Sequence, residues 1–399
     1  MEQPNLVMIP SGVKATKLYS IMPEDGVGDF TFDRNLNTAT RVNKDGLIEM
    51  VAEDVPRLNY DLVNGVPSQC PSLLLEPQRT NIITNSNSNN LNFALDNVSM
   101  TYNQIISPDG LNNGILFQQT GSNASNSAYN FGLTTADGDY TYSIFIKAND
   151  SEKIRFYSSN GVVLNQDFNP QEMTEGVVSG SLNLKFKDYG NGWFRVSFTR
   201  TLSSASHHRF SIYPDRNNTQ KGVYIYGLQV EVGSYPTSYI PTSGSTVTRS
   251  AETCTGAGNA STFNSEQGIL FAEMYWFETA TNIYLALTDG TNNNRVLIYS
   301  TSTSQITSLI SSGGATQASF TVSGQDTRAY NKIAVKYKAN DFSIYVNGQE
   351  LGTDTSGLAP VGMNDLGFIF YGKIKDLRYY DTEGMTDTEI DNLLTQLTQ

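Results

Sequence analysis

Charged side chains are scarce in this sequence, and most of those present are acidic. Only 16% of the 399 residues are charged, against about 25% in an average soluble protein, and 39 Asp and Glu outnumber 26 Lys and Arg. Nucleic acids and anionic membranes are bound by clustered basic side chains, because these release counterions from the phosphates. The net charge of −13 and the lack of a basic run therefore exclude nucleic acid and anionic lipid as expected partners.

Cysteines and histidines are also few. Cys70 and Cys254 lie in separate contexts, so neither a disulfide framework nor a zinc site is expected. The two histidines, His207 and His208, are adjacent, and no serine carries a nucleophile-elbow pattern, which argues against a Ser-His-Asp mechanism.

Long apolar runs are missing as well. No stretch approaches the roughly 20 apolar residues of a membrane span, and the first residues do not form a basic segment followed by an apolar one. We therefore expect that the protein does not insert into a membrane. We also expect that it is made in a cytoplasm without a signal peptide.

Metal ligands are sparse too. Asp289, Asn292 and Asn294 could supply oxygen ligands to calcium, but the Asp-Gly-Thr-Asn sequence around them is commoner as a turn. We therefore assign no metal ligands and expect no cofactor, and leave open whether calcium is bound.

The sequence is rich instead in runs where apolar and polar residues alternate, as in strands, and in turn residues. It is also rich in aromatic residues, with 22 Tyr and 19 Phe. Tyr140, Tyr142, Ile144 and Ile146 fall on one face of a period-two run. Similar runs recur at 154–158, 182–187, 193–199, 207–213, 223–232, 269–277, 283–288, 295–300, 331–338, 342–347 and 366–379. Asn347-Gly348 suits a type I′ hairpin turn. Short strands at this spacing favour sandwiches or jelly rolls.

Proline-bounded segments divide the chain. Pro56, Pro67, Pro71 and Pro77 precede one boundary, and residues 235–241 mark the next. We predict an all-β fold of tandem antiparallel β-sandwich (jelly-roll) domains with an N-terminal arm and one short C-terminal helix. The parts are residues 1–80, an arm or small β-subdomain; residues 81–248, a jelly roll; and residues 249–399, a sandwich with the helix.

The predicted helix lies at the end of the chain. Thr386 and Glu389 have the spacing of a capping box, in which each side chain satisfies an amide of the first helical turn. An apolar stripe follows at helical spacing, formed by Ile390, Leu393, Leu394 and Leu397. We expect this stripe to dock on a sandwich or a neighbouring subunit.

Four groups of motifs together carry a family resemblance. They are residues 17–20 with Phe32-Asp33-Arg34 and residues 39–49; Pro56-Arg57-Leu58 with residues 73–81; residues 192–197 with 224–231, 236–242 and 248–249; and residues 342–348 with 372–380 and the capped helix. This combination resembles bacteriophage tail-fibre, head-fibre and related virion proteins with lectin-like modules. The resemblance implies a carbohydrate-module-like jelly roll followed by a concanavalin-A-like or laminin-G-like sandwich.

The same resemblance implies a function and partners. It points to a virion structural protein that forms or decorates a head or tail fibre or other appendage and contacts host-cell surface polysaccharide. Other virion proteins are the implied partners, a homotrimer is the implied assembly, and the virion is the implied location. A purely structural decoration protein that binds no sugar, or a bacterial surface adhesin, remain alternatives.

One polar strand pattern offers a candidate glycan site. On one strand, His207, Arg209 and Tyr213 share a polar face with Ser211. On another, Gln229 and Glu231 lie on the polar face, and the opposite face of that strand is apolar. Planar hydrogen-bonding groups beside an exposed aromatic ring suit a sugar, whose hydroxyls need partners and whose C–H face needs a ring. The alternative is a merely solvated sheet face, and whether the two strands are adjacent is left open.

Catalysis is not expected. Concanavalin-A-like glucanases typically use a Glu-x-Asp-x-x-Glu strand, but residues 273–278 carry Tyr275 at the Asp position, and Glu278 would face away from Glu273 in a regular strand. No catalytic residue is therefore assigned. Trp193 and Trp276 are expected in the core, and Arg79 and Arg249 in ion pairs between domains.

Overall fold

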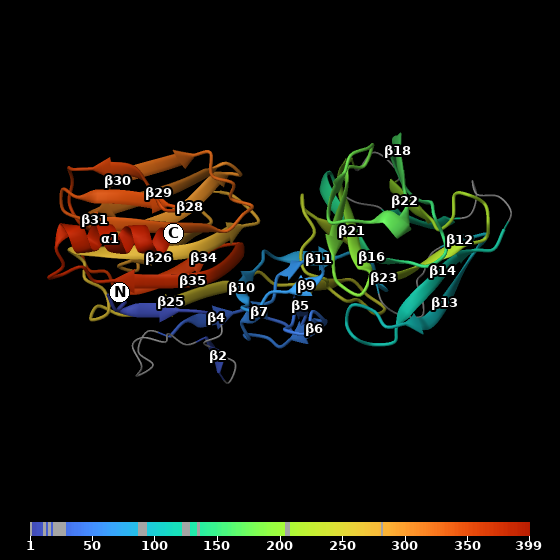
Figure 1. Ribbon diagram of the computed structural model, residues 1–399, viewed down its shortest axis with the longest axis horizontal. Coiled ribbons are helices and arrows are strands. Elements are labelled where there is room, and N and C mark those ends of the chain that lie inside the picture. Colours follow the sequence, from blue (N-terminus) through green and yellow to red (C-terminus); the bar gives the residue numbers. More distant parts are fainter. Residues whose placement is uncertain are drawn as a thin grey trace.

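The computed structural model describes residues 2–10, 13–14, 17–18, 29–86, 94–121, 128–133, 136–203, 208–280 and 282–399. The fold is almost entirely β, with several antiparallel sheets and a short C-terminal helix. Two lobes lie side by side along the long axis, and short N-terminal strands lie at the junction between them (Figure 1).

One lobe, here called the composite lobe, is a sandwich of two antiparallel sheets. Its first sheet contains, in order, β33 (Gln349–Asp354), β32 (Phe342–Val346), β31 (Asn331–Lys338), β26 (Gln267–Trp276), β35 (Gly372–Tyr380), β10 (Ser72–Leu75) and β7 (Arg57–Asn59), with β1 (Leu6–Met8) also paired to β35. Its second sheet contains β30 (Ala315–Ser323), β29 (Gln305–Ser312), β28 (Arg295–Ser302), β27 (Tyr284–Thr288), β34 (Asp365–Ile369), β25 (Thr253–Ala257) and β4 (Thr31–Asp33). The inward side chains of both sheets form one core that includes Trp276.

The N-terminal strands belong to this composite lobe. β1, β7 and β10 extend its first sheet, and β4 pairs with β25 in its second. Leu6, Phe30, Leu73 and Leu75 are buried in the same core as residues from the end of the chain. The predicted division at residue 80, with a separate N-terminal arm, is therefore wrong for these strands. Their apolar side chains complete a core that residues 249–399 supply only in part.

The other lobe, here called the inserted lobe, is a second sandwich. A five-stranded sheet has the order β12 (Ala94–Asp96), β15 (Ala128–Leu133), β22 (His208–Tyr213), β17 (Ile154–Asn160) and β18 (Val162–Phe168). A seven-stranded sheet has the order β13 (Val98–Ile105), β14 (Gly114–Gln119), β23 (Gly222–Val232), β16 (Gly138–Ala148), β21 (Trp193–Leu202), β20 (Leu184–Asp188) and β19 (Gly176–Val178). A short 3₁₀ helix at Pro170–Glu172 follows β18.

The inserted lobe interrupts the composite lobe, and the chain leaves and returns at one place. β11 (Arg79–Asn81) pairs antiparallel with β24 (Val247–Arg249), so the outgoing and returning segments lie side by side. The remaining two-stranded sheets join β5 (Ala39–Val42) to β6 (Ile48–Val51), β8 (Leu62–Val63) to β9 (Val66–Pro67), and β2 (Val13–Lys14) to β3 (Lys17–Leu18).

A cluster of buried charges lies at this junction. Arg57 and Arg249 both bind the Glu76 carboxylate, at 2.8 and 2.9 Å, and Arg34 binds Glu252 at 2.9 Å. Arg57 also binds Glu252. Ser238 lies in the segment by which the chain returns from the inserted lobe, and its hydroxyl donates to Glu76 at 2.6 Å. The expected pairing of Arg249 is thus confirmed, and this charge cluster ties the connecting segments to the composite lobe.

Helix α1 (Asp387–Thr398) begins as the sequence predicts. The Thr386 hydroxyl accepts from the Glu389 amide, and the Glu389 carboxylate accepts from the Thr386 amide. Its apolar stripe packs on side chains of the first sheet, including Ile269 and Phe271. Among the described residues, no helix is long and apolar enough to cross a membrane.

Candidate ligand-binding face

The predicted site residues are divided between two sheets. Arg209 and Tyr213 lie on β22 of the five-stranded sheet, whereas Gln229 and Glu231 lie on β23 of the seven-stranded sheet. His207 lies outside the described residues. The two strands are therefore not neighbours, and the five residues do not form one binding face.

Gln229 and Glu231 hold part of the junction together. Both are fully buried, and the Glu231 carboxylate accepts from the Thr237 amide at 2.9 Å and from its hydroxyl at 2.5 Å. Gln229 donates to Glu231 at 2.6 Å and accepts from the Ile240 amide at 2.7 Å. The prediction that these two side chains contact a glycan is wrong, because the segment containing Thr237 and Ile240 covers them.

The other two predicted residues that the structure describes, Arg209 and Tyr213, lie on a polar sheet face. Phe210 and Ile212 point into the core, as the alternation predicts, so Arg209 and Tyr213 lie on the outer face. Strand register places Ser159 opposite Arg209 and Arg155 opposite Tyr213.

Two arginines on this face lie over tyrosine rings. The Arg209 guanidinium carbon is 5.8 Å from the centre of the Tyr157 ring, and that of Arg216 is 5.1 Å from the centre of the Tyr213 ring. The two rings meet edge to face with centres 6.5 Å apart. Such stacking fixes the guanidinium plane, whose N–H groups lie along its edge. We call Arg155, Tyr157, Arg209, Tyr213 and Arg216 the arginine–tyrosine face.

Tyr213 is only 9% exposed. The sequence suggested a ring open for a sugar to stack on, but Arg216 lies over this ring. The surface that a ligand meets is therefore composed largely of guanidinium groups, and this part of the prediction needs correction.

Positive charge dominates the face. Arg155 forms a two-point pair with Asp167, one contact of which is 2.9 Å, and Lys153 lies 3.4 Å from the same carboxylate. Burial lowers the pKa of Arg216, and the nearby charge of Arg155 lowers that pKa further. Arg155, Arg216 and Lys153 thus lie near one carboxylate, that of Asp167, in a chain whose net charge is −13.

Sequence reasoning missed Arg155, Tyr157 and Arg216. The alternation of Ile154, Phe156 and Ser158 could have placed Arg155 and Tyr157 on a polar face of β17. The pairing of β17 with β22 joins segments about 50 residues apart in the sequence, and no local pattern encodes such a pairing.

The other candidate ligands have structural partners. Asp289 accepts from the Thr291 amide and the Asn294 side chain, both at 2.8 Å, and Asn292 accepts from Arg295 at 2.7 Å. Glu278 accepts from Arg79 at 2.5 Å, which confirms the expected pairing of that arginine. In the part of the chain that the structure describes, no three His, Cys, Asp or Glu side chains are grouped to hold a metal ion.

No protein-family model and no curated protein matches this chain. Among solved structures, the CBM40 of the Ruminococcus gnavus IT-sialidase bound to α2,3-sialyllactose is 16% identical, with a TM-score of 0.28 over 35% of this chain and 93% of that one. Domains LG4-5 of the mouse laminin α1 chain are 10% identical, with a TM-score of 0.25 over 63% and 85%. TM-scores this low carry no argument about function.

Proposed function

We propose that this chain is a non-enzymatic structural protein of a bacteriophage virion that contacts acidic polysaccharide on the host surface through the arginine–tyrosine face. One observation supports the glycan contact: in an acidic chain, Arg155 and Arg209 lie on one sheet face, and Arg216, from the segment after β22, stacks on Tyr213 of that face. Guanidinium groups bind carboxylates and sulfates through paired N–H donors, so acidic sugars fit this face better than neutral ones.

The stacked geometry favours binding, because Tyr157 and Tyr213 hold two of the guanidinium groups in place before a ligand arrives. A ligand then orders fewer side chains on binding, which improves affinity. Each face is small and partly neutralised by Asp167, so we expect weak binding at a single site. Linked copies in a trimer would raise the avidity by roughly 10² to 10⁴.

The virion context rests on the motif resemblance. In this proposal the chain forms or decorates a head or tail fibre or another appendage, assembles as a homotrimer with other virion proteins, and is located in the virion. Tyr- and Phe-rich sandwiches with a sparsely charged, Asn-, Ser- and Thr-rich surface suit such a particle component.

The test is binding of the purified protein to isolated host surface polysaccharide, compared with a variant carrying Arg209→Ala and Arg216→Ala. A control carrying Lys185→Ala and Arg295→Ala removes two cations from other surfaces and leaves the same net charge. We expect about a tenfold loss of affinity in the first variant and none in the control. Equal affinity in both variants, or no binding by the intact oligomer, would favour a purely structural decoration protein.

A further inference from the structure

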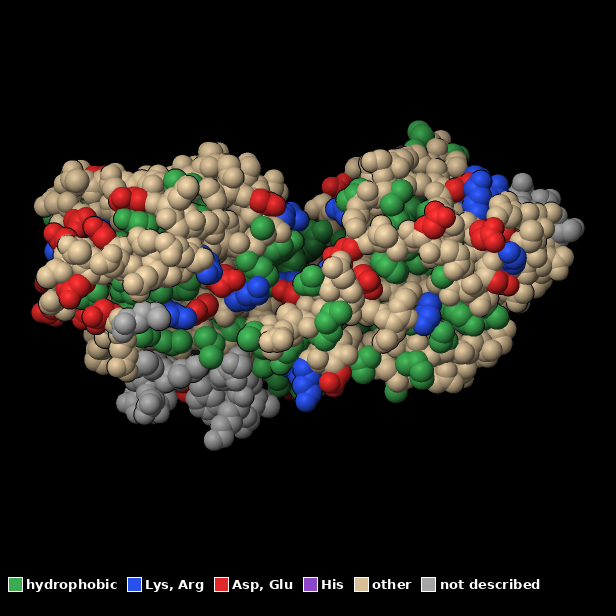
Figure 2. Space-filling view, viewed as in Figure 1, with side chains coloured by type: hydrophobic (Ala, Val, Ile, Leu, Met, Phe, Trp, Pro, Cys, Tyr) green, Lys and Arg blue, Asp and Glu red, His purple; other side chains and the backbone are tan. Residues whose placement is uncertain are grey.

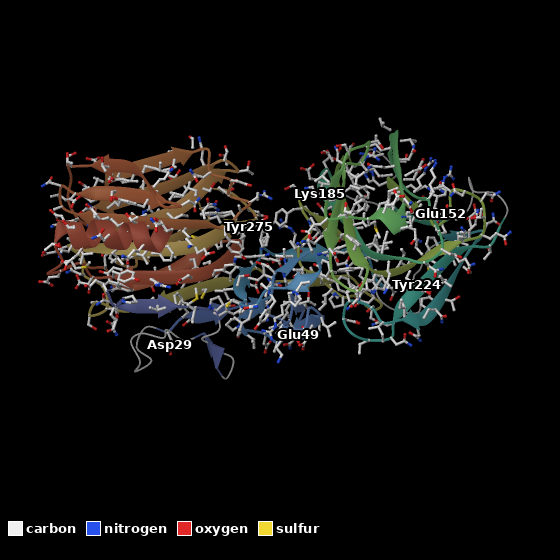
Figure 3. All side chains as sticks on the ribbon, viewed as in Figure 1. Asp29, Glu49, Glu152, Lys185, Tyr224 and Tyr275 are labelled. Atoms are coloured by element: carbon white, nitrogen blue, oxygen red, sulfur yellow. The ribbon has the colours of Figure 1, made fainter. Side chains whose placement is uncertain are left out.

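A cleft of about 720 Å³ lies between the two lobes, and its lining includes no residue of the arginine–tyrosine face. In Figure 2 the surface is hollowed there, with apolar and charged side chains mixed in the hollow. Figure 3 shows Tyr275 on the side of the composite lobe that faces the inserted lobe. Residues from β26, from the N-terminal hairpins and from the inserted lobe all line the cleft.

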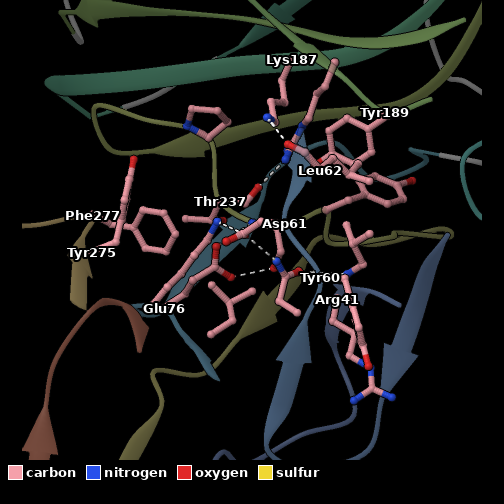
Figure 4. A pocket seen from close by; sticks show the side chains of 18 of the residues that line it. Arg41, Tyr60, Asp61, Leu62, Glu76, Lys187, Tyr189, Thr237, Tyr275 and Phe277 are labelled. Atoms are coloured by element: carbon pink, nitrogen blue, oxygen red, sulfur yellow. Dashed lines mark hydrogen bonds and ion pairs between the residues drawn. The ribbon is translucent and has the colours of Figure 1, made fainter. Parts of the chain in front are cut away.

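Aromatic rings stand on both walls of the cleft. Tyr275 and Phe277 come from the composite lobe, and Tyr189 comes from the inserted lobe (Figure 4). The ring centres of Tyr275 and Phe277 are 5.4 Å apart, and Tyr330 continues the row at 5.8 Å from Tyr275. All four rings are partly exposed. The Lys375 ammonium lies 3.7 Å from the centre of the Tyr330 ring and covers it, much as Arg216 covers Tyr213. The C–H face of a sugar therefore has the rings of Tyr275, Phe277 and Tyr189 to lie on.

Hydrogen-bonding groups lie beside these rings. The Tyr330 hydroxyl donates to Asp61 at 2.5 Å, and the Lys373 ammonium binds the same carboxylate. The Lys373 ammonium also lies 5.6 Å from the centre of the Tyr275 ring. Burial acts to raise the pKa of Asp61, but Lys373 and Tyr330 lower it overall, so this side chain is a charged acceptor.

The charges that line the cleft are largely paired with each other. Lys373 binds Asp61, Lys187 binds Glu175 at 2.5 Å, and Arg41 binds Glu49 at 2.7 Å. Glu76 is held by Arg57 and Arg249. Arg328 differs, since it is exposed and makes a cation–π contact with Tyr235 at 5.9 Å. An acidic or basic ligand would have to break these pairs, whereas an uncharged one can exchange hydrogen bonds with them.

The walls are held at a fixed separation. Glu76 lines the cleft and also belongs to the buried charge cluster, and Thr237 and Ser238 line it while bonding to Glu231 and Glu76. A cleft held in this way does not need to order its walls when a ligand binds.

From these observations we infer that the cleft between the lobes is a second binding site, and that its ligand is a segment of an uncharged oligosaccharide. Partly exposed rings on both walls, hydrogen-bonding groups between them and paired charges are the features that an uncharged, polyhydroxylated ligand needs. A charged peptide is disfavoured, because most of the charged side chains that line the cleft are already paired with one another.

The experiment titrates the full chain with neutral oligosaccharides of glucose, galactose, mannose and N-acetylglucosamine, and follows tyrosine fluorescence and calorimetric heat. At least one oligosaccharide should bind, and Tyr275→Ala should lower the affinity for it about tenfold. Tyr299→Ala, which removes a partly exposed ring outside the cleft lining, should leave the affinity unchanged. Unchanged unfolding midpoints in both variants would show that folding is intact.

A second variant separates this site from the arginine–tyrosine face. The Arg209→Ala, Arg216→Ala variant should bind the neutral oligosaccharide as well as the parent does, so the two proposals can fail independently. No binding of any neutral oligosaccharide at millimolar concentration would overturn the inference. Binding that Tyr275→Ala leaves unchanged, or that acidic sugars match, would also overturn it.

Discussion

Single residues decide whether a polar strand face is available to a ligand. Gln229 and Glu231 alternate with apolar neighbours as a solvent-facing pair would, yet both are fully buried. The alternation correctly separates the two faces of the strand but does not reveal that Thr237 and Ile240 cover the polar one. Arg209, in contrast, is exposed, as the alternation predicts.

The buried charge cluster predicts a large mutational effect at one residue. Glu252 accepts from Arg34 at 2.9 Å and from Arg57 at 2.7 Å, and both arginines are fully buried. Glu252→Gln removes the charge and leaves these arginines under-compensated, so the free energy of unfolding should fall by about 3 to 5 kcal/mol. Glu49→Gln breaks the partly exposed pair with Arg41 and should cost less than about 1 kcal/mol. Urea denaturation measures both, and equal losses would contradict the assigned role of the cluster.

Glu76 predicts a dependence of stability on pH. Burial alone would raise its pKa above the ordinary 4.5, but the charges of Arg249 and Arg57 and hydrogen bonds from Ser238 hold the pKa well below that value. A lowered folded-state pKa contributes stability that is complete above about pH 4.5 and is lost as the pH falls through the folded-state value. Free energies of unfolding between neutral and acidic pH should therefore decline less steeply in Glu76→Gln. Identical slopes would show that Glu76 does not titrate in this way.

At the scale of elements, local signals were sufficient. Asn347 and Gly348 both have positive φ, at 51° and 83°, as the predicted type I′ turn requires. The capping box at Thr386 and the apolar stripe behind it place α1 correctly. These features depend on a few consecutive residues, so no knowledge of the rest of the chain is needed to predict them.

The cap of α1 gives a prediction at this scale. Thr386→Ala removes the hydroxyl that accepts from the Glu389 amide, and the free energy of unfolding should fall by about 1 kcal/mol. Thr388→Ala changes an exposed residue in the first turn and should have a neutral or slightly stabilising effect, because alanine favours helices. Hydrogen exchange of the α1 amides would show whether the loss is local. A loss of the same size in both variants would argue against the cap.

At the scale of the whole molecule, the sequence predicted sandwiches but not their composition. β1 pairs with β35 across more than 360 residues, and β4 pairs with β25 across more than 200. Such pairings depend on which apolar edges remain uncovered after each sheet forms, and no local pattern reports this. The all-β class was therefore predictable, whereas the interrupted composite lobe and the cleft beside it were not.

The composite lobe predicts how fragments behave. Residues 249–399 alone lack β1, β4, β7 and β10 and expose a core normally covered by Leu73 and Phe32, so this fragment should not unfold cooperatively. Arg79 and Arg249 are strand partners, so residues 2–79 can be joined to residues 249–399 by a short flexible linker, which keeps Arg249 beside Glu76. This joined chain should show a cooperative thermal transition by calorimetry. Cooperative unfolding of residues 249–399 alone would contradict the composite lobe.

The most direct test of the proposed glycan contact compares one acidic polysaccharide with its carboxyl-reduced form. Affinity of the intact protein for both would be measured by calorimetry at low and high salt. The arginine–tyrosine face predicts binding to the acidic form that weakens about tenfold on reduction and also weakens as salt screens the arginines. Equal affinity for the two forms, or no binding to the acidic one, would contradict the account.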